Sequence, residues 1–232
     1  MNENYAWTTL LATSDFIGEV LCLHYSLQKV NSKYPLIVIA TDDISIKTLK
    51  ILQEAGIQYK IVKHYDFTKE VGHYKCTINK FYAFELKEYD KVCFIDADSF
   101  VIQNIDFIFR QKHFSGCRYE LEDNGLYKIF GALWLCLPKE HNFEDILKKY
   151  QDTKENDEAI LDTLYQDEIN KTENWMVDSD KFIKHVGGGF KFYEQIKLKT
   201  LKDFYLFINE NFYLLYKDTD LKDFNIWGDA NE

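Results

Sequence analysis

The sequence Lys91-Val-Cys-Phe-Ile-Asp-Ala-Asp-Ser-Phe-Val101 joins an apolar run to two closely spaced carboxylates. The run that ends at Ile95 predicts a strand buried on both faces, because continuous apolar runs are typical of parallel sheets. Asp96 and Asp98 follow with only the small Ala97 between them, and extended geometry would direct both carboxylates to the same side. The stretch therefore predicts a buried strand with a polar site at its carboxyl end.

Strands and helices alternate through the first half of the chain. Strands are predicted at residues 7–11, 36–40, 57–62 and 91–95, and helices at 16–30, from Ile46 to a stop at Gly56, and around 79–86. We expect Thr41-Asp42-Asp43 to form the N-cap region of the second helix. Such alternation implies an α/β fold with a mainly parallel central sheet and helices on both faces. In these folds ligands bind beyond the carboxyl ends of the strands, here after Leu11, Ala40 and Ile95.

The second half is less regular, and no linker separates it from the first. A strand is predicted at residues 131–137, helices at 143–150 and 157–165, and a glycine-broken strand–loop–strand at 182–192. The tail, residues 193–232, mixes Leu, Phe and Tyr with Lys and Asp, which predicts helices packed on the sheet. We expect one domain across the 232 residues.

Composition limits the classes of partner and compartment. The net charge of −10 argues against a nucleic-acid binder, which normally shows a basic stripe. Anionic ligands remain compatible, because a few lysines and one divalent cation can reverse the local field. Five cysteines without a C-x-x-C pair favour a reducing compartment. No leader-like N-terminus or apolar run of about 20 residues occurs, which predicts no transmembrane segment and a cytoplasmic protein, or one whose anchor lies outside this sequence.

Two motifs carry the chemistry. Asp96 and Asp98 could bind a hard divalent cation through oxygens and leave positions open for phosphates; alternatively, they are turn formers at a strand end. In Lys184-His-Val-Gly-Gly-Gly-Phe-Lys191, His185 could ligate a borderline metal such as Mn²⁺, and the glycines allow phosphate to approach the backbone. Lys191 adds a positive charge. The alternative is a tight hairpin with an incidental histidine.

Together these motifs resemble glycosyltransferase family 8, the family of glycogenin and of bacterial lipopolysaccharide glucosyl- and galactosyltransferases. The resemblance runs from about Thr8 to Lys191. Its segments occur in the family's order, at residues 9–14, 25–27, 36–41, 77–80, 94–101, 157–161 and 185–191. It implies a GT-A fold with a Rossmann-like nucleotide-binding half (1–100), a half that completes the metal and acceptor sites (101–192) and a helical tail (193–232).

The resemblance also implies roles for particular residues. Asp96, Asp98 and His185 match the ligands of Mn²⁺ or Mg²⁺, and Asp157 and Glu158 match the catalytic positions, where Glu158 replaces a frequent Gln. The donor, a UDP-sugar, is expected to contact the remaining matched residues: Leu10, Ala12, Thr13, Phe16, Lys80, Ala97, Gly188 and Lys191. Phe16 would stack on the base, and Gly188 and Lys191 would contact the diphosphate.

The implied reaction retains anomeric configuration. The acceptor hydroxyl would attack the anomeric carbon from the same face from which the leaving group departs. A phosphate oxygen of the leaving group would serve as base. Asp157 would orient the sugar or stabilise positive charge at the anomeric carbon; the alternative is a carboxylate that caps the helix starting near Asn156. The transferred sugar would be a hexose, glucose or galactose, and the acceptor a saccharide, a lipid-linked sugar or a protein. Self-glycosylation is left open, and a homodimer is compatible with the sequence.

Several residues depart from the family pattern. Phe192-Tyr193 replaces Pro-Trp, and Phe130-Gly131-Ala132 stands where an Asn-Ser or Asn-Ala pair often contacts the sugar, which leaves the identity of the donor open. The stretch from Leu161 to His185 is much shorter than in glycogenin. A catalytically silent nucleotide-sugar or metal-binding module is therefore a second hypothesis. An enzyme of phosphoryl or nucleotidyl transfer is a third, disfavoured because no Walker G-K-[ST] loop is present.

Overall fold

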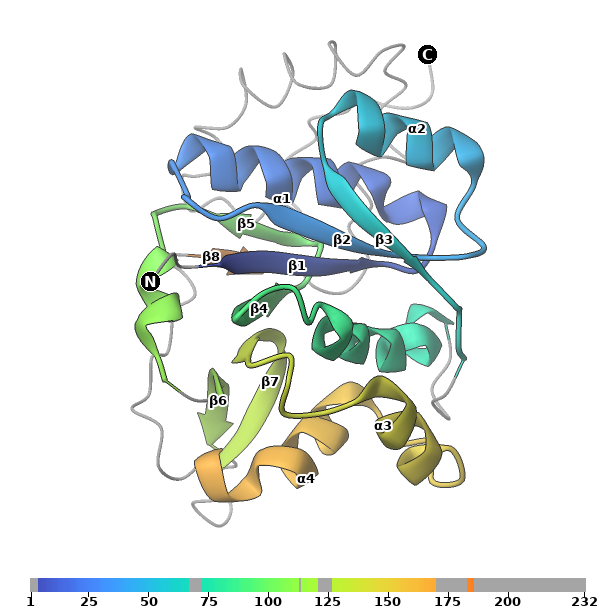
Figure 1. Cartoon of the computed structure of the whole chain (residues 1–232), viewed down its shortest axis with the longest axis vertical. Coiled ribbons are helices and arrows are strands. Elements are labelled where there is room, and N and C mark those ends of the chain that lie inside the picture. The colour runs from blue at the N-terminus through green and yellow to red at the C-terminus, as the bar shows by residue number, and fades with distance from the viewer. Residues whose placement is uncertain (1–3, 67–71, 113, 121–126, 170–182, 186–232) are drawn as a thin grey trace, which may run out of the picture.

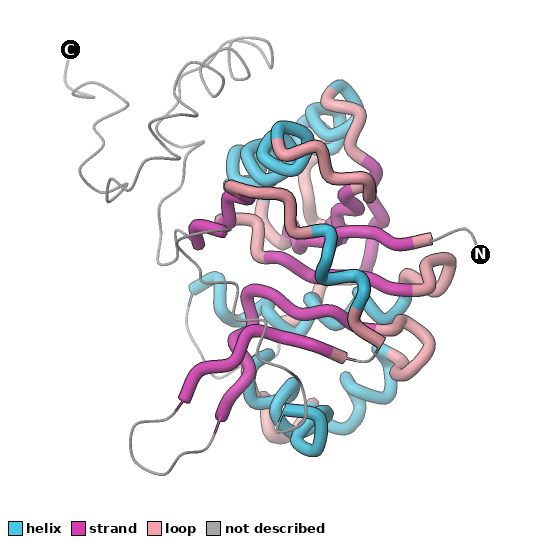
Figure 2. The backbone as a smooth tube through the Cα atoms, turned by 90° about the vertical axis from the view of Figure 1, so that its left-hand side faces the viewer, coloured by secondary structure: helices cyan, strands magenta, loops and turns pink. Residues whose placement is uncertain are grey.

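The computed structural model describes residues 4–66, 72–112, 114–120, 127–169 and 183–185. A six-stranded sheet in the order β3-β2-β1-β4-β7-β6 forms its centre (Figures 1 and 2). Its strands are β1 (Tyr5–Leu11), β2 (Leu36–Thr41), β3 (Gln58–Val62), β4 (Lys91–Ile95), β6 (Ser115–Glu120) and β7 (Tyr127–Cys136). The first four in sheet order are parallel, and β7 is antiparallel to β4 and β6. The mainly parallel α/β sheet expected from the sequence is confirmed.

The helices agree with the predicted positions in most cases. They are η1 (Ser14–Phe16), α1 (Ile17–Lys29), α2 (Ile46–Glu54), η2 (Gly72–Glu85), η3 (Asp106–Arg110), α3 (Phe143–Tyr150) and α4 (Asp157–Ile169). The helix predicted at 79–86 is instead the end of η2, a series of 3-10 turns. The sequence also did not predict β6, η3 or the short β5 (Ser99–Val101).

The N-cap predicted for α2 is wrong. Thr41 is the last residue of β2, and its hydroxyl bonds to the Asp43 carboxylate at 2.5 Å. Ser45 caps the helix, because its backbone is extended and its Oγ accepts the Thr48 N–H at 3.1 Å.

Two apolar cores lie on opposite faces of the sheet, because successive strand side chains point to opposite sides. On β1, Trp7 and Leu11 join the core beneath α1 and α2, whereas Ala6 joins the core beneath η2, α3 and α4. Figure 1 shows α1 and α2 on one side of β1 and α3 and α4 on the other. The predicted placement of helices on both faces is confirmed.

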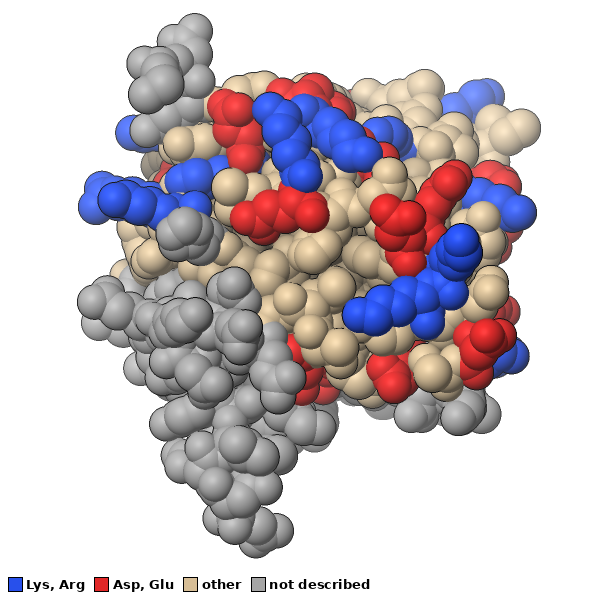
Figure 3. All heavy atoms as spheres, turned by 60° about the horizontal axis from the view of Figure 1, so that its bottom comes forward, with Lys and Arg blue, Asp and Glu red and all other residues tan. Residues whose placement is uncertain are grey.

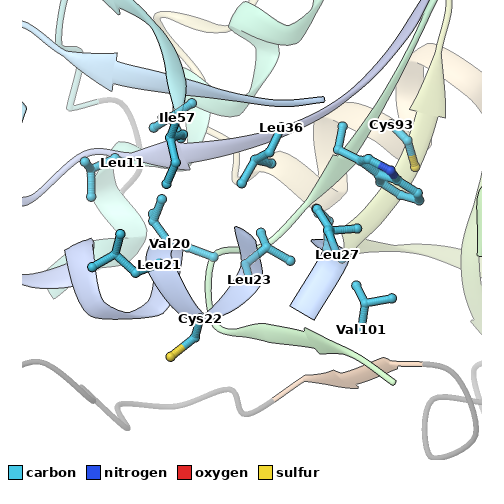
Figure 4. Close-up of a cluster of buried hydrophobic side chains, with 14 of the residues drawn as sticks. Leu11, Val20, Leu21, Cys22, Leu23, Leu27, Leu36, Ile57, Cys93 and Val101 are labelled. Carbon is cyan, nitrogen blue, oxygen red and sulfur yellow. The ribbon is translucent and has the colours of Figure 1, made fainter. Parts of the chain in front are cut away.

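Helix α1 is buried on two sides. Its side chains Val20, Leu23 and Leu27 point toward β1 and β2, whereas Cys22 points away from them (Figure 4). Helix α1 also packs against β5, which pairs with the short β8 (Ile183–His185) in a separate two-stranded sheet. The Ser26 Oγ accepts the Val101 N–H at 3.1 Å and so ties β5 to this helix.

The strand order positions a site. The chain runs outward from β1 through β2 to β3, and then returns to place β4 on the other side of β1. In open α/β sheets ligands bind at the carboxyl ends of the strands where the strand order reverses, and these strands are here β1 and β4. Ala12 and Asp96 begin the two segments that follow them.

Candidate active site

The Asp96-Ala97-Asp98 segment forms a tight turn between β4 and β5. The Ser99 N–H donates to the Asp96 carbonyl at 3.1 Å, and the Asp96 N–H donates to the Ala132 carbonyl on β7 at 2.9 Å. The expectation that this segment continues in extended geometry is therefore wrong, because the backbone reverses within it. The two aspartates do form a turn, as the structural alternative holds, and the turn is anchored by β4 on one side and by β5 on the other.

His185 belongs to the strand that pairs with β5. The antiparallel register places the His185 backbone opposite Ser99, the residue that follows Asp98. Residues separated by 86 positions in the sequence are thus brought together by one short ladder. The side chain of His185 lies outside what the structure describes, and Gly188 and Lys191 lie outside the described residues.

The donor set at this turn fits a hard divalent cation. Asp96 and Asp98 supply carboxylate oxygens, and both residues are partly exposed. Among the side chains that the structure describes, no group of three or more His, Cys, Asp or Glu could hold a metal ion. A third protein ligand would therefore come from a residue such as His185, whose side chain is not in that set.

Lys80 connects the Asp96 turn to α4. Its ammonium Nζ lies 2.9 Å from Asp96 Oδ1 and 2.8 Å from Asp157 Oδ2, and the side chain is buried. The Nζ also lies 5.4 Å from the centre of the Phe94 ring. Burial opposes the charge on Lys80, but the two ion pairs outweigh it and raise the pKa of the ammonium. Lys80 is therefore a fixed cation between two carboxylates.

Asp157 faces this cation from the first turn of α4. Its side chain is only 9% exposed. The N-cap of α4 is Asn156, whose Oδ1 accepts the Ala159 N–H at 2.9 Å. The structural alternative for Asp157, a capping carboxylate, is therefore wrong. Its position at a helix N-terminus still favours the negative charge.

Gly131 on β7 is a residue that sequence reasoning did not include in the site. A Cβ built on Gly131 would lie 2.4 Å from Asp157 Oδ2 and 3.1 Å from Glu158 Cγ. The Gly131 carbonyl also lies 3.5 Å from Lys80 Nζ. Glycine at this position leaves room for the side chains of Asp157 and Glu158 against β7, and a glycine within a predicted strand is the sequence signal that could have indicated it.

Glu158 also lies against Gly131. Its Oε1 accepts the Gly131 N–H at 3.2 Å, and the residue is half-buried. Burial raises the pKa of Glu158, and repulsion from Asp157 raises it further, whereas the Gly131 hydrogen bond lowers it. The structure thus brings Lys80, Asp96, Asp157 and Glu158 together around Gly131.

The loop after β1 lies at the same edge of the sheet. Ala12 is buried, and its carbonyl accepts the Thr41 hydroxyl at 3.4 Å. The Ser14 Oγ accepts the Ser45 N–H at 3.2 Å, which joins this loop to the start of α2. Leu10, Thr13 and Phe16 are partly exposed, and Phe16 also packs against the core beneath α1. The loop is therefore held in place by the end of β2 and the start of α2.

A separate groove lies at the opposite end of β4. It measures about 440 Å³, and its lining includes Lys87, Lys139, Asp145 and Lys149. Lys87 precedes β4 and Lys139 follows the antiparallel β7, so the groove lies away from Asp96. Figure 3 shows acidic and basic side chains interspersed on the side of the molecule that carries α3 and α4. The groove is not part of the candidate site.

Two further sequence expectations concern thiols and membranes. Cys22, Cys76, Cys93 and Cys136 are buried thiols, and the side chain of Cys117 is outside the described set. No helix in the described part of the chain combines the length and apolar character needed to cross a bilayer.

Comparisons with known proteins agree with this architecture. Residues 7–158 match the family model for glycosyl transferase family 8. The UDP-glucuronate:xylan alpha-glucuronosyltransferase 2 of Arabidopsis thaliana is 36% identical over 107 residues, which cover 45% of this chain and 18% of that protein. Galactinol synthase 2 of the same plant is 31% identical over 115 residues, 46% of this chain and 34% of that protein. The chain spans only about a fifth to a third of the length of these relatives.

Solved structures resemble the fold. The galactosyltransferase LgtC, in complex with donor and acceptor sugar analogues, superposes with a TM-score of 0.54 at 16% identity and covers 68% of this chain and 70% of its own. The glycosyltransferase GlyE of Streptococcus pneumoniae superposes with a TM-score of 0.55 at 17% identity, over 91% of this chain and 65% of its own. At these identities the likeness concerns the fold. Since the family model matches well over half of the chain and the fold superposes on both structures, this chain belongs to glycosyl transferase family 8 and has the GT-A fold.

Proposed function

We propose that this chain transfers a hexose, glucose or galactose, from a UDP-sugar to a saccharide, lipid-linked or protein acceptor, with retention of anomeric configuration. The observation that carries this proposal is the buried Lys80 ammonium between Asp96 and Asp157. It joins the carboxylate turn at the end of β4, where a diphosphate would be bound, to the carboxylate on α4 that would face the sugar. The Lys80 ammonium thus fixes the distance between the two carboxylates that this proposal assigns to the diphosphate and to the sugar.

The metal would be held by Asp96, Asp98 and His185. The carboxylates suit Mn²⁺ or Mg²⁺, and the register of β5 with β8 brings the His185 backbone beside them. When bound, the cation would neutralise the diphosphate and stabilise it as a leaving group. Asp96 also engages Lys80 through Oδ1, at 2.9 Å.

The nucleotide would lie at the carboxyl ends of the neighbouring strands β1 and β4. Leu10, Ala12 and Thr13 would line the uridine site, and Phe16 would stack on the base. Support comes from the strand order, which places this loop beside the Asp96 turn. Ala97 would border the donor from within the turn, and Gly188 and Lys191 would contact the diphosphate.

The sugar would lie against α4. Asp157 would orient it or stabilise positive charge at the anomeric carbon, and Lys80 holds the Asp157 carboxylate in place at 2.8 Å. The acceptor hydroxyl would attack from the face of the departing phosphate, whose oxygen takes the proton. Glycosyl transfer then needs no protein side chain as general base.

The test is release of UDP from UDP-glucose or UDP-galactose in the presence of Mn²⁺. Asp98→Ala is expected to abolish release, because it removes one of two described carboxylate ligands. Asp145→Ala, an exposed aspartate of α3 at the far end of β4, is expected to leave it unchanged. Undiminished turnover in Asp98→Ala, or full activity with excess chelator, would contradict the metal assignment. A chain that binds neither UDP nor any UDP-sugar would contradict the proposed reaction.

A further inference from the structure

We infer that Glu158 makes the sugar site selective for neutral hexoses and excludes donors whose sugar carries a carboxylate, such as UDP-glucuronate. The inference rests on the proposed function and narrows the class of donor. It is not a consequence of family membership, because a relative that matches this chain is named as a glucuronosyltransferase. It depends instead on the arrangement of charge around Gly131.

The described side chains at this site carry an excess of negative charge. Asp96 and Asp157 share the Lys80 ammonium, and Asp98 lies in the same turn as Asp96. Glu158 adds another carboxylate, which accepts the Gly131 N–H. Among the side chains described around Gly131, Lys80 is the cation, and both of its ion pairs are already made within the protein.

The position of the sugar follows from the position of the phosphates. Lys80 links Asp96 to Asp157. A diphosphate held at Asp96 and Asp98 would therefore place the attached sugar next to Asp157. Glu158 is the neighbouring residue on the same helical turn, and it too lies against Gly131. A carboxylate on the sugar would therefore meet Glu158, whereas a hydroxymethyl group could donate a hydrogen bond to it.

Glu158 has little freedom to avoid an acidic ligand. Its Oε1 is held by the Gly131 N–H at 3.2 Å, and its Cγ packs so closely on Gly131 that an added Cβ would lie 3.1 Å away. Moving the side chain aside would leave a strand N–H without this acceptor. Burial already raises the pKa of Glu158, and Asp157 raises it further, so the surroundings resist added negative charge.

The experiment compares neutral and acidic donors on the full chain with Mn²⁺. Dissociation constants for UDP, UDP-glucose, UDP-galactose and UDP-glucuronate would be measured by calorimetry for the wild-type chain and for Glu158→Gln. We expect the wild type to bind its preferred neutral donor at least about tenfold more tightly than UDP-glucuronate, because like charges in a desolvated site repel strongly. Glu158→Gln should reduce this ratio several-fold, since the amide keeps an acceptor for Gly131 and can donate to a carboxylate.

Asp162→Asn is the matched control. Asp162 lies one turn further along α4, and its Oδ1 accepts the Ile129 N–H of the same strand at 2.8 Å. The substitution removes one negative charge from the same helix. It should nevertheless leave the ratio of the dissociation constants for the neutral and the acidic donor unchanged.

Each outcome decides the inference. The inference would be overturned if the wild type bound UDP-glucuronate more tightly than the neutral donors. It would also be overturned if the ratio of the dissociation constants for the acidic and the neutral donor were equal in the wild type and in Glu158→Gln. Neither result would contradict transfer from a UDP-sugar. A ratio that falls equally in Asp162→Asn would assign the selection to the overall charge of α4 and would also overturn it. Absence of binding by UDP itself would overturn the proposed function and this inference with it.

Discussion

Lys80 and Asp157 lie 77 positions apart in the sequence and form a buried ion pair, with Nζ 2.8 Å from Oδ2. The pair connects the 3-10 segment η2 to the first turn of α4 across the end of the sheet. Through Asp96, the same ammonium reaches the turn at the end of β4. One side chain therefore sets the distance between the proposed diphosphate and sugar sites.

Replacing Lys80 should destabilise the protein. In Lys80→Met, Asp96 and Asp157 lose their shared cation, and we expect a loss of about 3–5 kcal/mol in the free energy of unfolding, as for other broken buried pairs. Urea denaturation would measure it. Lys87→Met removes a lysine paired with Glu85 at 3.0 Å nearer the surface, where the side chain of Lys87 is 44% exposed. Its cost should stay below about 1 kcal/mol, and equal losses in the two variants would contradict the structural role of Lys80.

Gly131→Ala should impair activity and stability together. The added Cβ would lie 2.4 Å from Asp157 Oδ2, so the start of α4 or the Asp157 side chain must shift. We expect about 1–3 kcal/mol of lost stability and at least a tenfold fall in UDP release, because small displacements of positioning groups reduce rates strongly. Gly116→Ala is the control. Its added Cβ would lie 3.3 Å from its nearest atom, Ile129 Cγ2, so this variant should change activity little. A fully active Gly131→Ala enzyme would show that the close approach of α4 is unnecessary.

Phe16→Leu should weaken binding of UDP while preserving the fold. Leucine keeps apolar contact with the core beneath α1 but cannot stack on a base. Because base–aromatic stacking contributes roughly 1–3 kcal/mol, the dissociation constant for UDP should rise about tenfold. Phe107→Leu alters another partly buried ring packed on the same core and should leave UDP affinity unchanged. If both variants bind UDP like the wild type, the assigned base site is wrong.

Glu158→Gln should be more stable than the wild type at neutral pH. The folded state raises the pKa of Glu158 above its unfolded value, chiefly through burial, so the ionised form costs stability once the pH exceeds the unfolded pKa. The advantage of the glutamine variant should therefore be absent below the unfolded pKa, grow as the pH rises to the folded pKa, and stay constant above it. Thermal unfolding of both proteins between pH 4 and 8 (about the unfolded pKa and well above it) would measure it. An advantage independent of pH would point to packing rather than charge.

Much of the first half could be predicted from local pattern. The apolar run from Leu36 to Ala40 and the run that ends at Ile95 could only be buried strands, and both are. Where local rules compete, prediction failed. Thr41 and Ser45 are both plausible caps, and the end of β2 decided between them by extending through Thr41.

Some residues of the candidate site could likewise be predicted from the sequence, whereas the role of another depends on tertiary packing. Asp96, Asp98, Lys80 and Asp157 could be selected by motif and by resemblance, and the structure brings Lys80, Asp96 and Asp157 into contact. Gly131 was noted in the sequence only as a departure from the family pattern. Its role depends on which helix packs against β7, and no local pattern in the strand specifies that partner.

The sequence by itself determined most of the strands and helices and the residues that follow the strand ends, because hydrophobic periodicity acts over a few residues. The tertiary structure alone decided that one ammonium serves both Asp96 and Asp157, and that Glu158 lies against Gly131. These contacts join elements far apart in the chain, and they exist because β7 enters the sheet beside β4 and carries α4 onto the carboxyl edge. The order of strands, which is a property of the whole packed core, therefore turned separate polar residues into one site.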